Sequence, residues 1–147
     1  VYKRQPLDLA FDGADAIDPA GLCVKGAGGA MVRERVLAES APRFIVLVDP
    51  PKIVASLDEW GVLPIAVVPF AADRVALQLD DLAPLRRDQP SDDGMVLLDL
   101  QVPAGGDWQA VADRARALPG VLDHGLFTLV LSDVLVGHGD GTVTTAG

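Results

Sequence analysis

Apolar residues occur along this chain in short blocks separated by glycine, proline and aspartate, as in proteins where strands and helices alternate. Continuous apolar runs at residues 7–11 and 44–48 predict buried strands, and a shorter run at 22–24 predicts another. Between them, residues 30–41 place apolar side chains on one face of a helix. Strand, helix and strand in this order predict parallel pairing in a sheet with covered faces.

The pattern changes after Leu57. The expected elements are then a strand at 63–69, a helix at 71–82, a short strand at 85–88, a strand at 95–102, a helix at 108–118 and a strand at 121–127. This order is typical of a split βαβ, ferredoxin-like unit. A last apolar run at 128–136 ends in a glycine-rich turn. We therefore expect a catalytic α/β domain in residues 6–62 and 128–147, and a small α+β subdomain in residues 63–127.

Composition narrows the class of protein. Half of the 147 residues are hydrophobic and 22% are charged, with a mean hydropathy of +0.31, which favours a folded core over disorder. The net charge of −9 argues against nucleic acid as a partner. No apolar run approaches the roughly 18 residues of a membrane span, so no membrane partner is expected. One cysteine excludes an internal disulfide and fits a reducing cytoplasm, where we expect the protein to be soluble.

The N-terminus begins with Val-Tyr-Lys-Arg-Gln, which corresponds to the translation of a common sequencing-transposon end. We expect residues 1–5 to be a foreign scar and leave them out of the fold prediction. The alternative is an ordinary basic N-terminus. If the scar interpretation holds, the chain is expected to be the C-terminal fragment of a longer protein, inactive by itself.

Residues suited to proton transfer gather in residues 12–35. Asp12 and Asp15 lie in a turn-forming DGAD stretch, Lys25 precedes a glycine-rich turn, and Glu34 follows in the second turn of the expected helix. A carboxylate base and a nearby ammonium can move a proton beside a carbonyl and stabilise the resulting oxyanion. Each residue also has an ordinary explanation: an Asx turn for the aspartates, and solvated surface charges for the other two.

Other residues are expected to have structural roles. Paired carboxylates can bind a divalent metal, but no histidine lies near these in sequence, so we expect no metal. Cys23 is expected to be a small buried hydrophobe, and His124 and His138 to be structural. Arg86 and Arg87 are expected to be a pair of solvated charges.

Seven blocks carry a recognisable pattern. In chain order they are DGADAID, VKGAGGAMVRER, FIVLVDPPK, LPIAVVP, SDDGMVLLD, LPGVLDHGLF and VGHGDGTV. Their order resembles that of the ribose-5-phosphate isomerase A family over about residues 7–143. The resemblance implies an α/β fold, a partial Rossmann-like parallel sheet with an inserted α+β subdomain. It also implies a cofactor-free aldose–ketose isomerase of the non-oxidative pentose phosphate pathway. Such an enzyme interconverts D-ribose 5-phosphate and D-ribulose 5-phosphate through an enediolate, usually as a homodimer or higher oligomer.

The resemblance also implies roles for individual residues. Glu34 matches the general base, and the other expected catalytic residues are Asp12, Asp15 and Lys25. The expected substrate-binding residues are Asp12, Gly13, Ala14, Asp15, Lys25, Gly26, Ala27, Gly28 and Lys52. The family's N-terminal segment, with its phosphate cradle, has no counterpart in this sequence.

Four positions depart from the family pattern: Ala16, Ala27, Pro51 and Ala66. None removes an expected catalytic residue, and Ala27 is acceptable only where its φ is negative. These departures leave open a non-catalytic homologue that binds a sugar phosphate. A CoA-transferase-like enzyme of the same wider fold, with Glu34 as nucleophile, is the other alternative.

Overall fold

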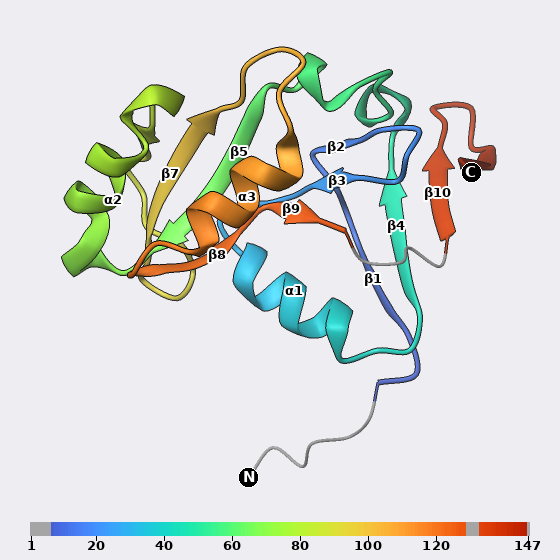
Figure 1. Cartoon of the computed structure of the whole chain (residues 1–147). Coiled ribbons are helices and arrows are strands. Elements are labelled where there is room, and N and C mark those ends of the chain that lie inside the picture. Colours follow the sequence, from blue (N-terminus) through green and yellow to red (C-terminus); the bar gives the residue numbers. More distant parts are fainter. Residues whose placement is uncertain (1–6, 129–132, 147) are drawn as a thin grey trace, which may run out of the picture.

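The protein's structure, a computed structural model, describes residues 7–128 and 133–146 and arranges them in three β-sheets with three α-helices (Figure 1). The expected scar at residues 1–5 lies outside the described residues, and so does the middle of the apolar run at 128–136. Among the residues that are described, no helix is both long enough and apolar enough to cross a membrane.

The first sheet is mixed and mostly parallel. Its strands, in spatial order, are β1 (Ala10–Asp12), β4 (Phe44–Val48), β10 (Asp133–Gly137) and β11 (Val143–Ala146). Strand β4 pairs in parallel with β1 and β10, and β11 is antiparallel to β10. Helix α1 (Met31–Glu39) directly precedes β4 and forms the last part of the connection from β1 to β4. The strands predicted at residues 7–11 and 44–48 and the helix before the second of them are confirmed, and so is the parallel pairing of these two strands. The strand predicted at residues 22–24 is antiparallel and belongs to another sheet.

The expectation that both faces of this sheet are covered is wrong for the described residues. Along β4, Phe44, Val46 and Val48 are buried, whereas Leu47 is 42% exposed. On β1, Phe11 is 67% exposed. One face packs against Ala38 of α1 and the second sheet, and the opposite face is open in the described part of the chain.

The second sheet is small and was not predicted as a sheet. It contains β2 (Ala16–Ile17), β3 (Cys23–Val24) and β9 (Leu126–Phe127), all antiparallel. Because side chains alternate across a strand, each strand contributes one residue to each of two hydrophobic cores. Ala16, Val24 and Leu126 pack with the third sheet, and their neighbours pack with the first. This sheet therefore joins the two larger ones.

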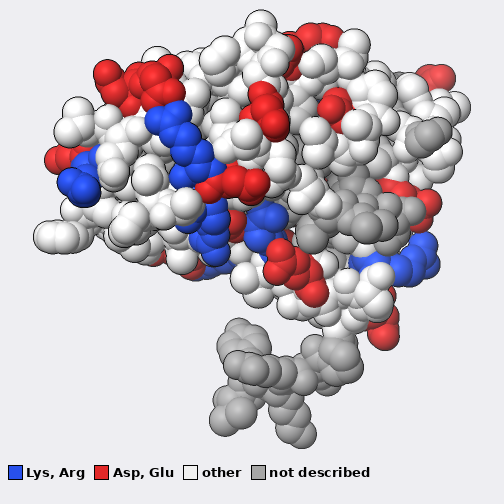
Figure 2. Space-filling model, viewed as in Figure 1, with Lys and Arg blue, Asp and Glu red and all other residues white. Residues whose placement is uncertain are grey.

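The third sheet is wholly antiparallel, with strand order β6 (Leu85–Arg86), β7 (Val96–Gln101), β5 (Val62–Val67) and β8 (Val121–His124). Helices α2 (Ala72–Gln78) and α3 (Trp108–Arg116) pack against it in one core. On the face shown in Figure 2, acidic side chains lie beside basic ones. Arg114 and Asp81, for example, form a 2.6 Å ion pair in this part of the chain. The chain is thus α/β, with a mostly parallel sheet and a separate antiparallel sheet.

The strand predicted at residues 121–127 is divided between two sheets, β8 in the third and β9 in the second. The break is at Gly125, where a Cβ atom would overlap the carbonyl oxygen of Lys25. The backbones come this close because Lys25 donates its N–H to Gly125, 2.9 Å away, and Gly125 donates to Pro64 at 2.7 Å. Only glycine leaves room for this crossing, which also fixes the position of Lys25.

Candidate active site

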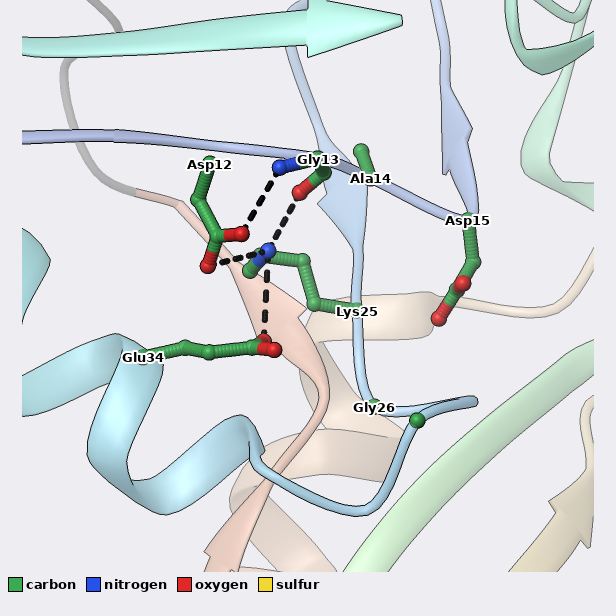
Figure 3. A pocket seen from close by; sticks show the side chains of 8 residues that line it. Asp12, Gly13, Ala14, Asp15, Lys25, Gly26 and Glu34 are labelled. Atoms are coloured by element: carbon green, nitrogen blue, oxygen red, sulfur yellow. Dashed lines mark hydrogen bonds and ion pairs between the residues drawn. The ribbon is translucent and has the colours of Figure 1, made fainter.

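A pocket of about 170 Å³ opens at the carboxyl end of β1, between β3 and the start of α1. Figure 3 shows its lining side chains converging from these three elements. The lining residues are Asp12, Gly13, Ala14, Asp15, Lys25, Gly26, Gly28 and Glu34. Apart from Ala27 and Lys52, these are all the residues expected at the site.

Asp12, Lys25 and Glu34 each lie at or next to the end of a strand or helix that borders this pocket. Strand β1 ends at Asp12, whose carboxylate accepts the N–H of Gly13 at 2.8 Å. Strand β3 ends just before Lys25. Helix α1 begins at Met31 and therefore has Glu34 in its first turn, one turn earlier than expected. In this position the positive end of the helix dipole lies near the carboxylate.

Lys25 lies at the centre of the site. Its Nζ is 3.0 Å from Asp12 Oδ2 and 3.2 Å from Glu34 Oε2, and it also donates to the carbonyl oxygen of Gly13. The side chain is 3% exposed, so these partners replace water around the ammonium. One buried cation thus bridges two carboxylates from different elements.

Glu34 has a raised pKa, chiefly because burial disfavours its charged form; Lys25 opposes this shift, and the negative charge of Asp12 adds to it. Its Oε2 atom is buried and, among the described residues, accepts no hydrogen bond of good geometry, although Lys25 lies within ion-pair distance. A carboxylate with a raised pKa and an unused lone pair is suited to take up a proton.

The glycine-rich turn after Lys25 also lines the pocket. The N–H of Ala27 donates to Asp15 Oδ2 at 2.8 Å, which ties the turn to the DGAD segment. Gly26 and Gly29 have φ of +116° and +84°, conformations that favour glycine. Ala83 is the non-glycine residue with positive φ in the described part of the chain, so Ala27 satisfies the condition set by its sequence.

Lys52 and three of the departures from the family pattern lie away from the pocket lining. Lys52 Nζ is 5.7 Å from the centre of the Trp60 ring, and Pro51 precedes it in a 3₁₀ turn. Ala16 and Ala66 are fully buried in apolar clusters. The two alanines therefore affect packing beneath the site rather than the chemistry within it.

Two arginines near the site were not identified from the sequence. Arg35 donates to Asp123 Oδ2 at 2.7 Å and lies over the Phe127 ring at 4.1 Å, which joins α1 to β8 and β9. The expectation that Arg87 is solvated is wrong: its side chain is 21% exposed and contacts the glycine turn. Neither contact has a local sequence signature, because each joins residues about 60 to 90 positions apart.

Cys23, next to the site, is buried as expected. Burial raises the pKa of its thiol to about 12, and the positive charge of Lys25 offsets this only in part. The group is therefore a protonated thiol at neutral pH, without the thiolate that a cysteine nucleophile needs.

Residues 1–141 match the family described as ribose 5-phosphate isomerase A (phosphoriboisomerase A). The chain belongs to this family. It is 44% identical to the ribose-5-phosphate isomerase A of Roseiflexus sp. (strain RS-1), with 97% of the chain and 65% of the relative aligned. It is 40% identical to that of Thermomicrobium roseum, over 92% of the chain and 61% of the relative. The chain thus spans somewhat less than two thirds of the length of these curated relatives.

Solved ribose 5-phosphate isomerases share the fold. The enzyme from Methanocaldococcus jannaschii superposes with a TM-score of 0.84 at 30% identity, over 96% of this chain and 66% of the other. The Plasmodium falciparum enzyme gives a TM-score of 0.85 at 28% identity, over 99% and 67%. A further relative, at 29% identity and a TM-score of 0.83 over 96% and 65%, was solved in complex with phospho-erythronic acid.

Proposed function

We propose that the protein is an aldose–ketose isomerase that interconverts D-ribose 5-phosphate and D-ribulose 5-phosphate through an enediolate. The observation that carries this proposal is the position of Lys25 between Asp12 and Glu34 in the pocket. Family membership adds the substrate, because the relatives bear the name of this enzyme. No metal or organic cofactor is required for this chemistry.

The first step removes the proton from C2 of the open-chain aldose. A carboxylate oxygen of Glu34 takes the proton, the C2–H electron pair forms the C1=C2 double bond, and negative charge develops on O1. The Lys25 ammonium stabilises that oxyanion. General-base catalysis of this kind contributes roughly 10² to 10⁴ in rate.

The second step returns the same proton from Glu34 to C1. The C1=C2 electron pair forms the new C1–H bond, O2–H gives up its proton as the C2=O bond of the ketose forms, and O1 takes up a proton to become a hydroxyl. We assign the transfer of hydroxyl protons to Asp12 and Asp15, which line the pocket beside Lys25. Atoms and electrons balance without an oxidant or a reductant.

Substrate contacts complete the proposed site. We assign further contacts with the substrate to the backbone of five residues: Gly13, Ala14, Gly26, Ala27 and Gly28. All of them line the pocket except Ala27, which lies in the adjoining glycine turn. Lys52 is retained as a substrate contact from its match to the family, and it lies over Trp60 rather than in the pocket lining.

The proposed domain division is a partial Rossmann-like catalytic domain (residues 6–62 and 128–147) and a split βαβ subdomain (63–127). The strand order β6-β7-β5-β8, with a helix after β5 and another after β7, supports the subdomain. We further propose a homodimer that works in the cytoplasm, as expected for this family.

The test compares the intact gene product with its Glu34→Gln variant in a ribose 5-phosphate isomerisation assay. We expect kcat to fall at least 10²-fold with little change in KM, because Gln keeps the shape of the side chain but accepts no proton. Glu39→Gln is the matched control, since Glu39 is exposed at the far end of the same helix.

Three results would contradict the proposal. Undiminished turnover by Glu34→Gln would remove the base assignment. Tight sugar-phosphate binding without turnover by the wild-type protein would identify a non-catalytic homologue. A glutamyl thioester formed from an acyl-CoA substrate would identify a CoA-transferase-like enzyme instead.

A further inference from the structure

Arg87 connects the antiparallel sheet to the glycine turn of the pocket. It follows β6, and its backbone N–H donates to the carbonyl oxygen of Leu97 at 3.0 Å. Its guanidinium forms a two-pronged pair with Asp99 of β7, with Nε–Oδ2 and Nη2–Oδ1 distances of 2.8 and 2.7 Å. The remaining terminal nitrogen, Nη1, donates to the carbonyl oxygens of Gly26 at 2.7 Å and Ala27 at 3.1 Å.

These contacts are shielded from solvent. The side chains of Arg87 and Asp99 are 21% and 17% exposed, so their charges are weakly screened. The two prongs on Asp99 fix the plane of the guanidinium, and that plane then fixes where Nη1 points. Arg87 thus holds the carbonyl oxygens of two successive residues of the turn from one side.

The other side of the same peptide units faces the site. In a trans peptide the C=O and N–H groups point in opposite directions, and the described residues contain no cis peptide. When Arg87 holds the Gly26 carbonyl, the N–H of Ala27 points away from it, and this N–H donates to Asp15 at 2.8 Å. When Arg87 holds the Ala27 carbonyl, the N–H of Gly28, a residue that lines the pocket, likewise points away from Arg87.

Two further contacts, at Gly29 and beside the turn, are weaker. The N–H of Asp92 donates to Gly29 at 3.3 Å, and Arg33 forms a 2.7 Å ion pair with Asp93. Arg33 is 57% exposed, so solvent screens this pair and it contributes little. Among the described residues, Asp15 and Arg87 are therefore the charged side chains that hold this turn, Asp15 at the Ala27 N–H and Arg87 at the carbonyl oxygens of Gly26 and Ala27.

We propose that Arg87 is a positioning residue for the isomerase site: it orients the Gly26–Ala27 and Ala27–Gly28 peptide units so that Ala27 N–H holds the Asp15 carboxylate and Gly28 N–H faces the substrate. This inference rests on the proposed isomerase function. Arg87 itself touches neither substrate nor reacting atoms.

The informative variant is Arg87→Lys in the intact gene product. Lysine keeps a positive charge beside Asp99, but one ammonium group lacks the planar fork that reaches a carboxylate and two carbonyls together. Arg114→Lys is the matched control, because Arg114 also makes a two-pronged pair, with Asp81, and donates to a carbonyl, that of Gln78. That cluster lies between α3 and the end of α2, away from the glycine turn.

Two measurements test the role. With kcat and KM determined at least 20 °C below the unfolding midpoint, we expect Arg87→Lys to lower kcat tenfold or more, and Arg114→Lys to stay within twofold of wild type. By ¹⁵N NMR, we expect protection of the Ala27 amide proton from exchange to fall at least tenfold in Arg87→Lys and to be unchanged in Arg114→Lys.

Either of two results overturns the positioning role. One is a wild-type kcat in Arg87→Lys. The other is unchanged protection of Ala27, which can be measured even in a protein that turns nothing over. Failure of the isomerase proposal is seen separately, as a wild-type protein without turnover.

Discussion

Lys25 and Glu34 form an ion pair across the pocket, with Nζ and Oε2 3.2 Å apart and side chains 3% and 22% exposed. The first residue follows β3 and the second lies in the first turn of α1. Because Lys25 also contacts Asp12 at 3.0 Å, its single charge is shared between two carboxylates. A change at Lys25 therefore alters the proton affinity of Glu34.

Replacing Lys25 by Met is expected to lower kcat/KM at least 10²-fold. The variant loses the cation that we assign to the oxyanion, and removal of one such group typically costs 10² to 10³ in rate. The pKa of Glu34 should rise further in the variant, because in the wild-type protein Lys25 opposes the upward shift. Steady-state kinetics across pH measure both effects, and an acid limb at the wild-type position would contradict the coupling.

The Lys52→Met variant tests whether Lys52 contacts the substrate without acting on the reacting atoms. Lys52 lies over Trp60 and outside the pocket lining. We expect KM to rise severalfold while kcat stays within about threefold of wild type, since this lysine supplies binding but no transition-state charge. A kcat loss as large as that of Lys25→Met would place Lys52 at the reacting centre, and an unchanged KM would remove it as a substrate contact.

Glu34 should make stability depend on pH in a defined direction. Its pKa in the folded protein lies above the ordinary value of 4.5, so the folded state binds the proton more tightly than the unfolded state does. The stability from this group is fully present below pH 4.5 and is lost as the pH rises through the folded pKa. The free energy of unfolding of Glu34→Gln, minus that of wild type, should therefore increase over this window.

Urea unfolding at several pH values measures that difference, and Glu39→Gln is the control. The acid limb of kcat/KM should report the same ionisation, since the proposed base must be unprotonated to act. A difference that stays flat or decreases with pH would show that the pKa of Glu34 is not raised.

Gly125→Ala should disturb the site by displacing the backbone of Lys25. The added Cβ would overlap the carbonyl oxygen of Lys25 and approach Pro64 Cδ to 3.1 Å, so β3 must move. Forcing an extra carbon into a closed site typically costs about 1–3 kcal/mol. A shift of about 1 Å at Lys25 should also lower kcat by roughly 10²-fold.

Gly139→Ala is the control for this substitution, because nothing lies within 4 Å of the Cβ that it would add. Its unfolding free energy should stay within about 0.5 kcal/mol of wild type. Equal stability of the two variants in chemical denaturation would contradict the close approach at Gly125.

Arg35→Met should destabilise the fold strongly. Arg35 is the partner of Asp123, which is 9% exposed, and it also donates to the carbonyl oxygens of His124 and Leu126. Removing one member of a buried pair leaves the other charge uncompensated and costs about 3–5 kcal/mol. Arg43→Met, which breaks a pair whose members are 60% and 44% exposed, should cost less than about 1 kcal/mol. Similar midpoints for both variants in urea would argue against this role of Arg35.

Local patterns were enough to predict most of the secondary structure. The apolar run at 44–48 became β4 with those bounds, and the helix expected at 108–118 became α3, which begins at the same residue. Elements without a strong local pattern were not predicted, or were predicted as part of a different arrangement of strands. Strand β2 is two residues long, and the strand expected at 121–127 changes sheets at Gly125. Such features depend on what the chain meets elsewhere in the fold.

The sequence by itself determined the family and the identity of the four charged residues at the site. Asp12, Asp15, Lys25 and Glu34 lie within one short segment, whose order of residue types is specific even though each type is common on protein surfaces. The tertiary structure alone decided that Lys25 is shared by two carboxylates and that Arg87 supports the glycine turn. The physical reason is that pKa values, ion-pair distances and burial depend on which distant segments pack together, and a linear pattern does not contain those contacts.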